Sequence, residues 1–110
     1  MKNQKRYLIW VSFDLGVGGD YEGMYRWLDN HKAKECGDNC ATLHYSSKAN
    51  LLAELKKDLK GSVRLNEKRN RVYVVYREDS KIKGAFVIGR RRQAPWTGYG
   101  VLEEEAVDEE

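Results

Sequence analysis

Hydrophobic and polar positions alternate with a period of two near the beginning of the chain. Between residues 7 and 14 every odd position is large and apolar, the four residues being Tyr7, Ile9, Val11 and Phe13. The even positions include Leu8 and Trp10 and end with Asp14. Because successive side chains of a strand point to opposite faces of a sheet, this pattern predicts a strand over 7–14 with its odd face in the core.

A glycine-rich turn and a helix are predicted next. The segment GVGGD, residues 16–20, matches neither G-x-G-x-x-G nor G-x-x-x-x-G-K-[ST], so it favours a mobile loop over a nucleotide-binding motif. Asp20 is a residue type that caps helices. The apolar positions after it have helical spacing, and they are Tyr21, Met24, Tyr25 and Leu28.

A hairpin and a second helix follow. Residues 34–45, KECGDNCATLHY, predict two short strands around a Gly-Asp-Asn turn. The stretch 48–61 has an apolar stripe of leucines, which are Leu51, Leu52, Leu55 and Leu59. Ser46 or Ser47 is the expected N-cap of this helix, and Gly61 suits its C-terminal cap.

The last predicted elements are strands. RVYVVYR, residues 71–77, is β-branched and aromatic; EDSKIKG is turn-like; and AFVIGRRR, residues 85–92, predicts another strand. The whole order predicts an α+β fold of the ferredoxin-like βαββαβ type with an extra C-terminal strand. A length of 110 residues suits one domain, which we place at residues 1–102.

Composition and charge narrow the class of protein. The chain is 41% hydrophobic, too apolar for a disordered chain. It has no apolar run of the roughly 18 residues that span a membrane, and its first residues lack a signal peptide's apolar region and cleavage site. These features predict a folded cytoplasmic protein with no membrane partner.

Charge is distributed unevenly along the chain. Six of the 17 acids lie in residues 103–110, EEEAVDEE, which we expect to be a disordered acidic tail. Residues 1–102 therefore carry all 20 Lys and Arg against 11 acids, a net charge of +9. A basic domain suggests a polyanionic partner, RNA or DNA, although a well-solvated surface explains the charge equally well.

Two cysteines, Cys36 and Cys40, are too few for a secreted disulfide scaffold and form a poor zinc signature. Reduced thiols are the simplest interpretation. Their spacing also predicts that they face each other across the hairpin, close enough to bridge if oxidised.

The stretch YLIWVSFDLGVGGDYEGMYRWLDN resembles the start of the small SinR-like proteins, relatives of the VapD toxins and of the small CRISPR spacer-acquisition protein (Cas two). The resemblance extends loosely through APWTGYG. It implies a ferredoxin-like homodimer in which the aspartates that end the two first strands approach each other. In several such relatives this pair binds magnesium and supports cleavage of RNA or DNA, and the matching residue here is Asp14. Other relatives bind nucleic acid or proteins without hydrolysis.

Residue chemistry leaves two interpretations of Asp14. Two carboxylates that approach across a two-fold axis would repel unless a hard cation such as magnesium lay between them. Alternatively, Asp14 ends the strand and binds N–H groups of the glycine loop. His44 shares the predicted face of Asp14 and is a candidate acid or base, although a packing role is commoner for a lone histidine. His31 suits the negative end of the first helix.

Basic residues near the last hairpin are the candidates for phosphate contact, and they are Arg71, Arg77, Lys81, Lys83, Arg90, Arg91 and Arg92. Trp96 and Tyr99 follow them, and we favour packing in a dimer over base stacking for both. The sequence therefore predicts a nucleic-acid-handling homodimer, either a magnesium-dependent endoribonuclease of toxin–antitoxin or phage-defence type or a non-catalytic module that binds nucleic acid or a protein.

Overall fold

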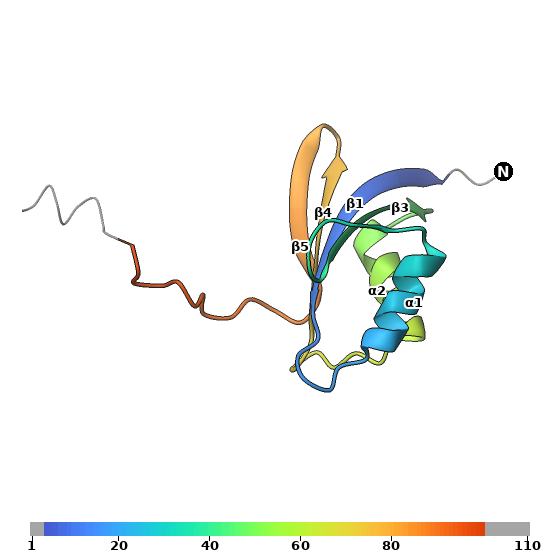
Figure 1. Cartoon of the computed structure of the whole chain (residues 1–110). Coiled ribbons are helices and arrows are strands. Elements are labelled where there is room, and N and C mark those ends of the chain that lie inside the picture. Colours follow the sequence, from blue (N-terminus) through green and yellow to red (C-terminus); the bar gives the residue numbers. More distant parts are fainter. Residues whose placement is uncertain (1–3, 101–110) are drawn as a thin grey trace, which may run out of the picture.

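The computed structural model describes residues 4–100 and contains one sheet and two helices (Figure 1). The elements are β1 (Lys5–Asp14), α1 (Tyr21–Asn30), β2 (Lys34–Glu35), β3 (Cys40–Ser47), α2 (Leu51–Ser62), β4 (Arg71–Glu78) and β5 (Lys81–Ile88). The predicted acidic tail, residues 103–110, lies outside the described residues. Neither helix in the described part has the length and hydrophobicity needed to cross a membrane.

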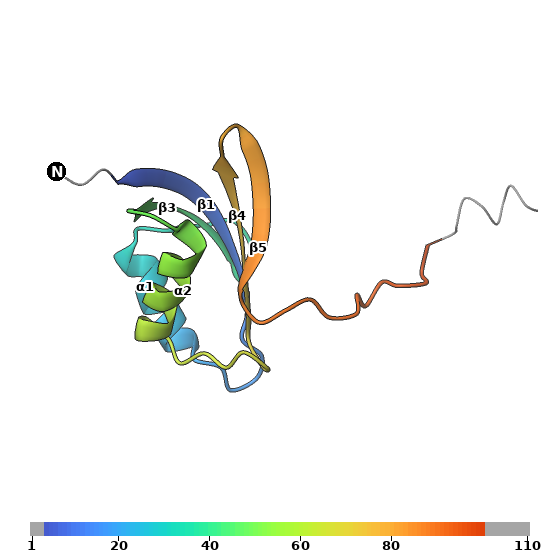
Figure 2. The same cartoon turned by 180° about the vertical axis from the view of Figure 1, so that it is seen from behind.

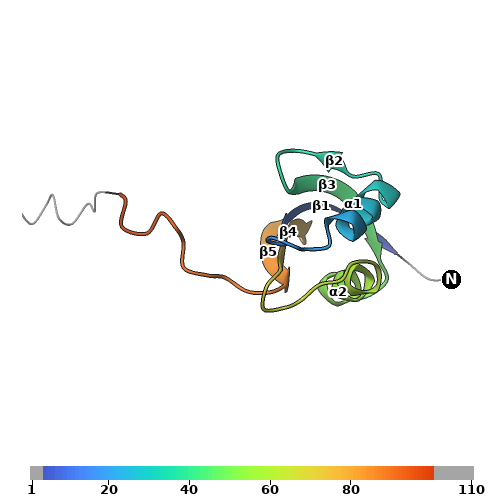
Figure 3. The ribbon, with the colours of Figure 1, turned by 60° about the horizontal axis from the view of Figure 1, so that its bottom comes forward.

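The sheet has the strand order β2-β3-β1-β4-β5, and every neighbouring pair is antiparallel. Both helices cover the same face, so the opposite face carries no helix (Figures 1 and 2). The short strand β2 lies at the edge beside β3 (Figure 3). The predicted α+β class is therefore confirmed, with β1 in the middle of a single antiparallel sheet.

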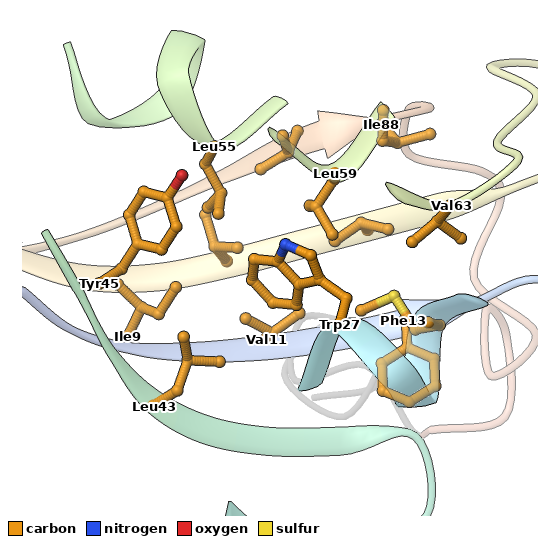
Figure 4. Packing of buried hydrophobic residues seen from close by; sticks show 14 of the residues in the cluster. Ile9, Val11, Phe13, Trp27, Leu43, Tyr45, Leu55, Leu59, Val63 and Ile88 are labelled. Atoms are coloured by element: carbon orange, nitrogen blue, oxygen red, sulfur yellow. The ribbon is translucent and has the colours of Figure 1, made fainter. Parts of the chain in front are cut away.

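The core lies between the sheet and the two helices. The odd face of β1 is buried as predicted, and Ile9 and Val11 are completely inaccessible to solvent. Trp27 of α1 lies in the centre of the cluster, with side chains of β1 below it and Leu59 of α2 above it (Figure 4). Burying these large apolar groups supplies most of the free energy that favours folding.

The two helices begin at different kinds of cap. Asp20 accepts a hydrogen bond from the Gly23 N–H, which confirms it as the N-cap of α1. The predicted serine caps of α2 are wrong, because Ser46 and Ser47 continue β3 and Asn50 accepts from the Ala53 N–H instead. Gly61 lies inside α2 rather than after it.

The last hairpin also differs from the prediction. Only Asp79 and Ser80 form its turn, both with positive φ, and β5 begins already at Lys81. β5 ends at Ile88, so Arg90, Arg91 and Arg92 do not belong to a strand. After β5 the chain runs away from the sheet (Figures 1 and 2), and it makes a turn at residues 95–98.

Candidate functional site

Asp14 ends β1 on the uncovered face, which we call the open face: the sheet face that carries Leu8, Trp10, Thr42, His44, Tyr73, Val75 and Phe86. Arg71, the first residue of β4, lies opposite Asp14 in the β1–β4 register. Its guanidinium donates to the Asp14 carboxylate at 2.8 Å and holds the pKa of that carboxyl below its ordinary value. The acid is therefore an ionised partner of an arginine.

The ion pair limits how well this chain alone suits magnesium. Asp14 remains half-exposed, but its carboxylate already accepts from Arg71. Within the described residues no group of three or more His, Cys, Asp or Glu side chains gathers that could hold a metal ion. Magnesium prefers several oxygen ligands around it. A fit would therefore need a second carboxylate from outside the chain.

His44 lies on the open face with Asp14, as predicted, but it is not near it. Its neighbour on β1 is Leu8, six residues before Asp14. At about 3.3 Å per residue, this places the two side chains about 20 Å apart along the strand direction. Within one chain the structure does not bring the two predicted catalytic residues together.

Basic side chains gather where β1 ends and β4 begins. Two adjoining hollows lie there, with volumes of about 560 and 460 Å³, and both are lined by Lys68 and Arg92. We call their basic residues the basic end; they are Arg64, Lys68, Arg69, Arg71, Arg90, Arg91 and Arg92. Such a concentration of cations in a concave surface attracts polyanions.

A hydrogen-bonded loop, residues 64–70, carries three members of the basic end. The Asn66 side chain accepts from the N–H groups of Lys68 and Arg69. The buried Asn70 accepts from the Asn66 N–H and donates to the Leu15 carbonyl at 2.9 Å. These bonds fix the loop against the glycine turn, so its cations are presented on an ordered backbone.

Glu67 joins this loop to two other parts of the molecule. Its carboxylate accepts from the Gly89 N–H at 2.9 Å and lies 3.0 Å from the ammonium groups of Lys56 and Lys60 on α2. The Gly89 bond and the two lysines lower the pKa of Glu67 to about 2. Glu67 therefore lines the first hollow together with the arginines after Gly89, while its carboxylate is paired with two lysines of α2.

The glycine turn borders the second hollow. Gly16 and Gly18 have positive φ, and Val17 at the tip is fully exposed, while Leu15 at the base is buried. Asp20 has a second role here, since it accepts from the Arg64 N–H at 2.9 Å as well as from Gly23. Both bonds, with that of Arg64 the stronger influence, lower the pKa of Asp20.

The predicted phosphate-binding residues separate into two groups. Arg71, Arg90, Arg91 and Arg92 line the first hollow together. Arg77 and Lys83 lie near the Asp79–Ser80 turn, at the opposite end of the β4–β5 hairpin. There Lys83 already pairs with Glu78 at 3.0 Å. Six residues of strand separate Arg77 from Arg71, again about 20 Å.

Aromatic side chains occur beside the basic end and beyond it. The Arg91 guanidinium lies 5.6 Å from the centre of the Phe86 ring, and Phe86 in turn contacts Tyr73 edge-to-face. Trp96 and Tyr99 are 73% and 86% exposed, so neither packs against the described part of its own chain. Their predicted packing in a dimer remains a prediction.

The candidates for phosphate contact that the sequence predicted do not include Arg64, Lys68 and Arg69. The signal was present: four of the eight residues from 64 to 71 are basic. What the sequence did not reveal is that this loop packs beside the segment after Gly89.

Comparison of the chain with family models, with curated proteins and with solved structures finds no match. The resemblance to the SinR-like and VapD-like proteins therefore stays a prediction from the sequence.

Proposed function

We propose that this protein binds nucleic acid, RNA or DNA, through the basic end. The single observation that carries the proposal is the convergence of seven Lys and Arg side chains on two adjoining hollows. The acids nearby are engaged in ion pairs: Asp14 with Arg71, and Glu67 with two lysines of α2. Guanidinium groups in this arrangement suit the oxygens of successive phosphates.

We further propose a homodimer that covers the open face. Leu8 and Trp10 are 42% and 40% exposed although they lie in the middle of the sheet, and Val75 and Phe86 extend the apolar surface beside them. An apolar sheet face without a helix over it favours association. Light scattering at micromolar concentration should give twice the mass of the chain, and a monomer would contradict this part of the proposal.

A ferredoxin-like arrangement is the finer fold that we propose. Its support is the order strand, helix, strand, strand, helix, strand from β1 to β4, with both helices on one face. In this interpretation β5 is the addition, because it pairs only with β4 at the sheet edge.

The test of nucleic-acid binding compares two triple variants of equal charge. Replacing Arg90, Arg91 and Arg92 with Ala removes three cations from the basic end. The matched control replaces Arg77, Lys81 and Lys83 with Ala and removes three cations from the other end of the hairpin. Binding of a fluorescent single-stranded RNA, and of DNA of the same sequence, is measured over a range of salt concentrations.

We expect the arginine triple to weaken binding and to flatten its salt dependence by up to about 0.9 log unit for each phosphate that the protein no longer neutralises. The control should retain most of the wild-type salt dependence. An equal loss of affinity in both variants would mean that net charge alone attracts the polyanion. Unchanged binding in the arginine triple would contradict a phosphate site at the basic end.

Magnesium-dependent cleavage of RNA is a second candidate function. The observation that favours it is the half-exposed Asp14 carboxylate on the open face, where a second copy would present the same residue. Magnesium bound there would supply a Lewis acid for phosphate chemistry. Incubation of the purified protein with RNA and with magnesium or manganese tests it directly, and intact RNA would leave the binding module as the function.

A further inference from the structure

The two cysteines face each other across the first hairpin. β2 pairs with β3 so that Glu35 lies opposite Ala41, and the next pair in this register is Cys36 and Cys40. Their sulfur atoms are 3.3 Å apart as thiols. A disulfide bond is about 2.05 Å long, so its formation requires only a short movement of the two sulfurs.

The backbone holds this geometry. The Cys36 N–H donates to the Cys40 carbonyl at 3.0 Å, and the Cys40 N–H donates to the Gly37 carbonyl at 3.2 Å. Gly37 and Asn39 have positive φ, which closes the turn after only three residues. Directly opposite residues of antiparallel strands have Cα separations of about 4.5 to 5.5 Å, within the range that disulfides span. The hairpin therefore aligns the thiols before any oxidant arrives.

We propose that Cys36 and Cys40 form a site of reversible oxidation, which becomes an internal disulfide by exchange with a small disulfide such as glutathione disulfide. This modification site is independent of the proposed nucleic-acid binding and does not rest on it.

The exchange proceeds in two balanced steps. The Cys36 thiolate attacks one sulfur of glutathione disulfide, which forms a mixed disulfide and releases one glutathione thiolate. The Cys40 thiol then loses its proton and attacks the Cys36 sulfur, which releases the second glutathione thiolate. The two cysteine thiols are oxidised to one disulfide, glutathione disulfide is reduced to two glutathione molecules, and the two thiol protons pass to the two leaving thiolates.

The surroundings of the two thiols indicate which cysteine reacts first with the oxidant. Cys36 is exposed, whereas Cys40 is half-buried. Burial, followed by the hydrogen bond with Cys36, raises the pKa of the Cys40 thiol. Cys36 therefore meets the oxidant, and Cys40 resolves the mixed disulfide. The bridge would close the turn whose Asn39 carbonyl accepts from the Phe13 N–H at 3.0 Å, directly before Asp14.

The test equilibrates the full chain in buffers of graded ratios of reduced to oxidised glutathione. Thiols are then trapped with iodoacetamide, and whole-protein masses are measured. Cys36→Ser and Cys40→Ser serve as matched variants, and the wild-type chain unfolded in denaturant serves as the reference without hairpin geometry.

We expect the folded wild-type chain to pass from two alkylated thiols to an unalkylated form lighter by two hydrogens, without a lasting glutathione adduct. Each serine variant should instead retain one adduct. The oxidation equilibrium constant should be at least tenfold larger in the folded than in the unfolded chain, a potential about 30 mV more negative. A lasting mixed disulfide in the wild type, a disulfide-linked dimer, or equal constants in both states would overturn the proposal.

Discussion

At the scale of single residues, Asp14 and Arg71 form the contact on which both candidate functions depend. The carboxylate lowers the positive charge of the basic end, but it also fixes the guanidinium at 2.8 Å. Asp14 is 51% exposed, so solvent screens the pair and its contribution to stability is small. Its replacement should therefore change function more than folding.

Asp14→Asn should tighten nucleic-acid binding, because the amide keeps the shape of the side chain but removes a negative charge next to Arg71. The free energy of unfolding should fall by less than about 1 kcal/mol. If the protein cleaves RNA with magnesium, the same change should abolish cleavage, since the cation loses its carboxylate ligand. RNA titrations, denaturant unfolding and a cleavage assay measure the three effects.

The matched control is Asp79→Asn, which removes the same charge at the opposite end of the β4–β5 hairpin. It should leave binding nearly unchanged. Equal tightening by both variants would show that the charge of Asp14 acts only through the net charge of the protein.

The second prediction at this scale concerns Glu67 and the pH dependence of folding stability. Its pKa in the folded chain is about 2, below its ordinary value of 4.5. A depressed pKa means that the ionised acid stabilises the folded state above about pH 4.5, and that this contribution is lost as pH falls toward 2. Glu67→Gln should therefore cost about 1 kcal/mol at neutral pH, after allowance for solvent screening, and almost nothing in strong acid.

Thermal unfolding at a series of pH values checks this prediction. Glu22→Gln is the control, because Glu22 is 84% exposed and pairs with Arg26 on its own helix. Parallel pH profiles for the wild type and Glu67→Gln would contradict the role assigned to Glu67.

At the scale of elements, alternation and helical spacing predict correctly which face of a strand or helix is buried when only one face is apolar. The odd face of β1 from residue 7 to 13 is buried as expected, because this pattern has one clearly apolar side. Three of the four predicted leucines of α2 are buried, and the fourth, Leu52, is half-buried. In α1 the predicted stripe is displaced: Tyr25 is 55% exposed, whereas Trp27 is buried. The aromatic residues of α1 lie on more than one side of the helix, so only packing against the sheet decides which of them faces the core.

β5 shows where such patterns fail. Its first four residues are all exposed, and Ile82 is the single large apolar side chain among them, so they show no alternation and resemble a turn. They form a strand because β4 supplies hydrogen-bonding partners along its whole length, from Glu78 opposite Lys81 to Val72 opposite Ile88. A long-range pairing therefore determines the element, and no local property of KIKG reveals it.

Gly89 joins this strand to the basic end. The prediction at the scale of elements concerns its replacement. Gly89 has φ +77, and a Cβ there would collide with the Asn70 carbonyl oxygen. Gly89→Ala should cost about 1–3 kcal/mol of stability and displace the three following arginines, which weakens nucleic-acid binding. Chemical denaturation and RNA titration measure the two effects.

Gly18→Ala provides the control, since Gly18 has φ +80 but a Cβ there meets no atom within 4 Å. This variant should lose only the stability that an alanine with positive φ costs, about 1–2 kcal/mol. A loss of stability for Gly89→Ala no larger than that of the control, with unchanged binding, would contradict the close packing of this junction.

At the scale of the whole molecule, the basic end combines two segments that are distant in the sequence, 64–71 and 90–92, and both lie beside the end of β1. The β1–β4 pairing places Arg71 beside Asp14, and Asn70 binds the Leu15 carbonyl 55 positions earlier in the chain. The sequence supplied the residue types and the arginine run, but it did not place the 64–70 loop beside that run. It also suggested that Arg77 and Lys83 share the site, although they lie at the other end of the hairpin.

The distribution of charge leads to the last prediction. Residues 1–102 carry a net charge of +9, and residues 103–110 carry six acids against no base. Acids tethered to the chain compete with phosphate for the same cations at a high effective concentration. Deletion of residues 103–110 should therefore tighten nucleic-acid binding at low salt, and the difference in affinity should shrink as salt screens the charges.

A variant that keeps the length but replaces the six acids with Gln and Asn should behave like the deletion. Binding of the same RNA to all three proteins, measured at low and high salt, separates charge from chain length. Wild-type affinity in the neutral-tail variant at low salt would contradict electrostatic competition.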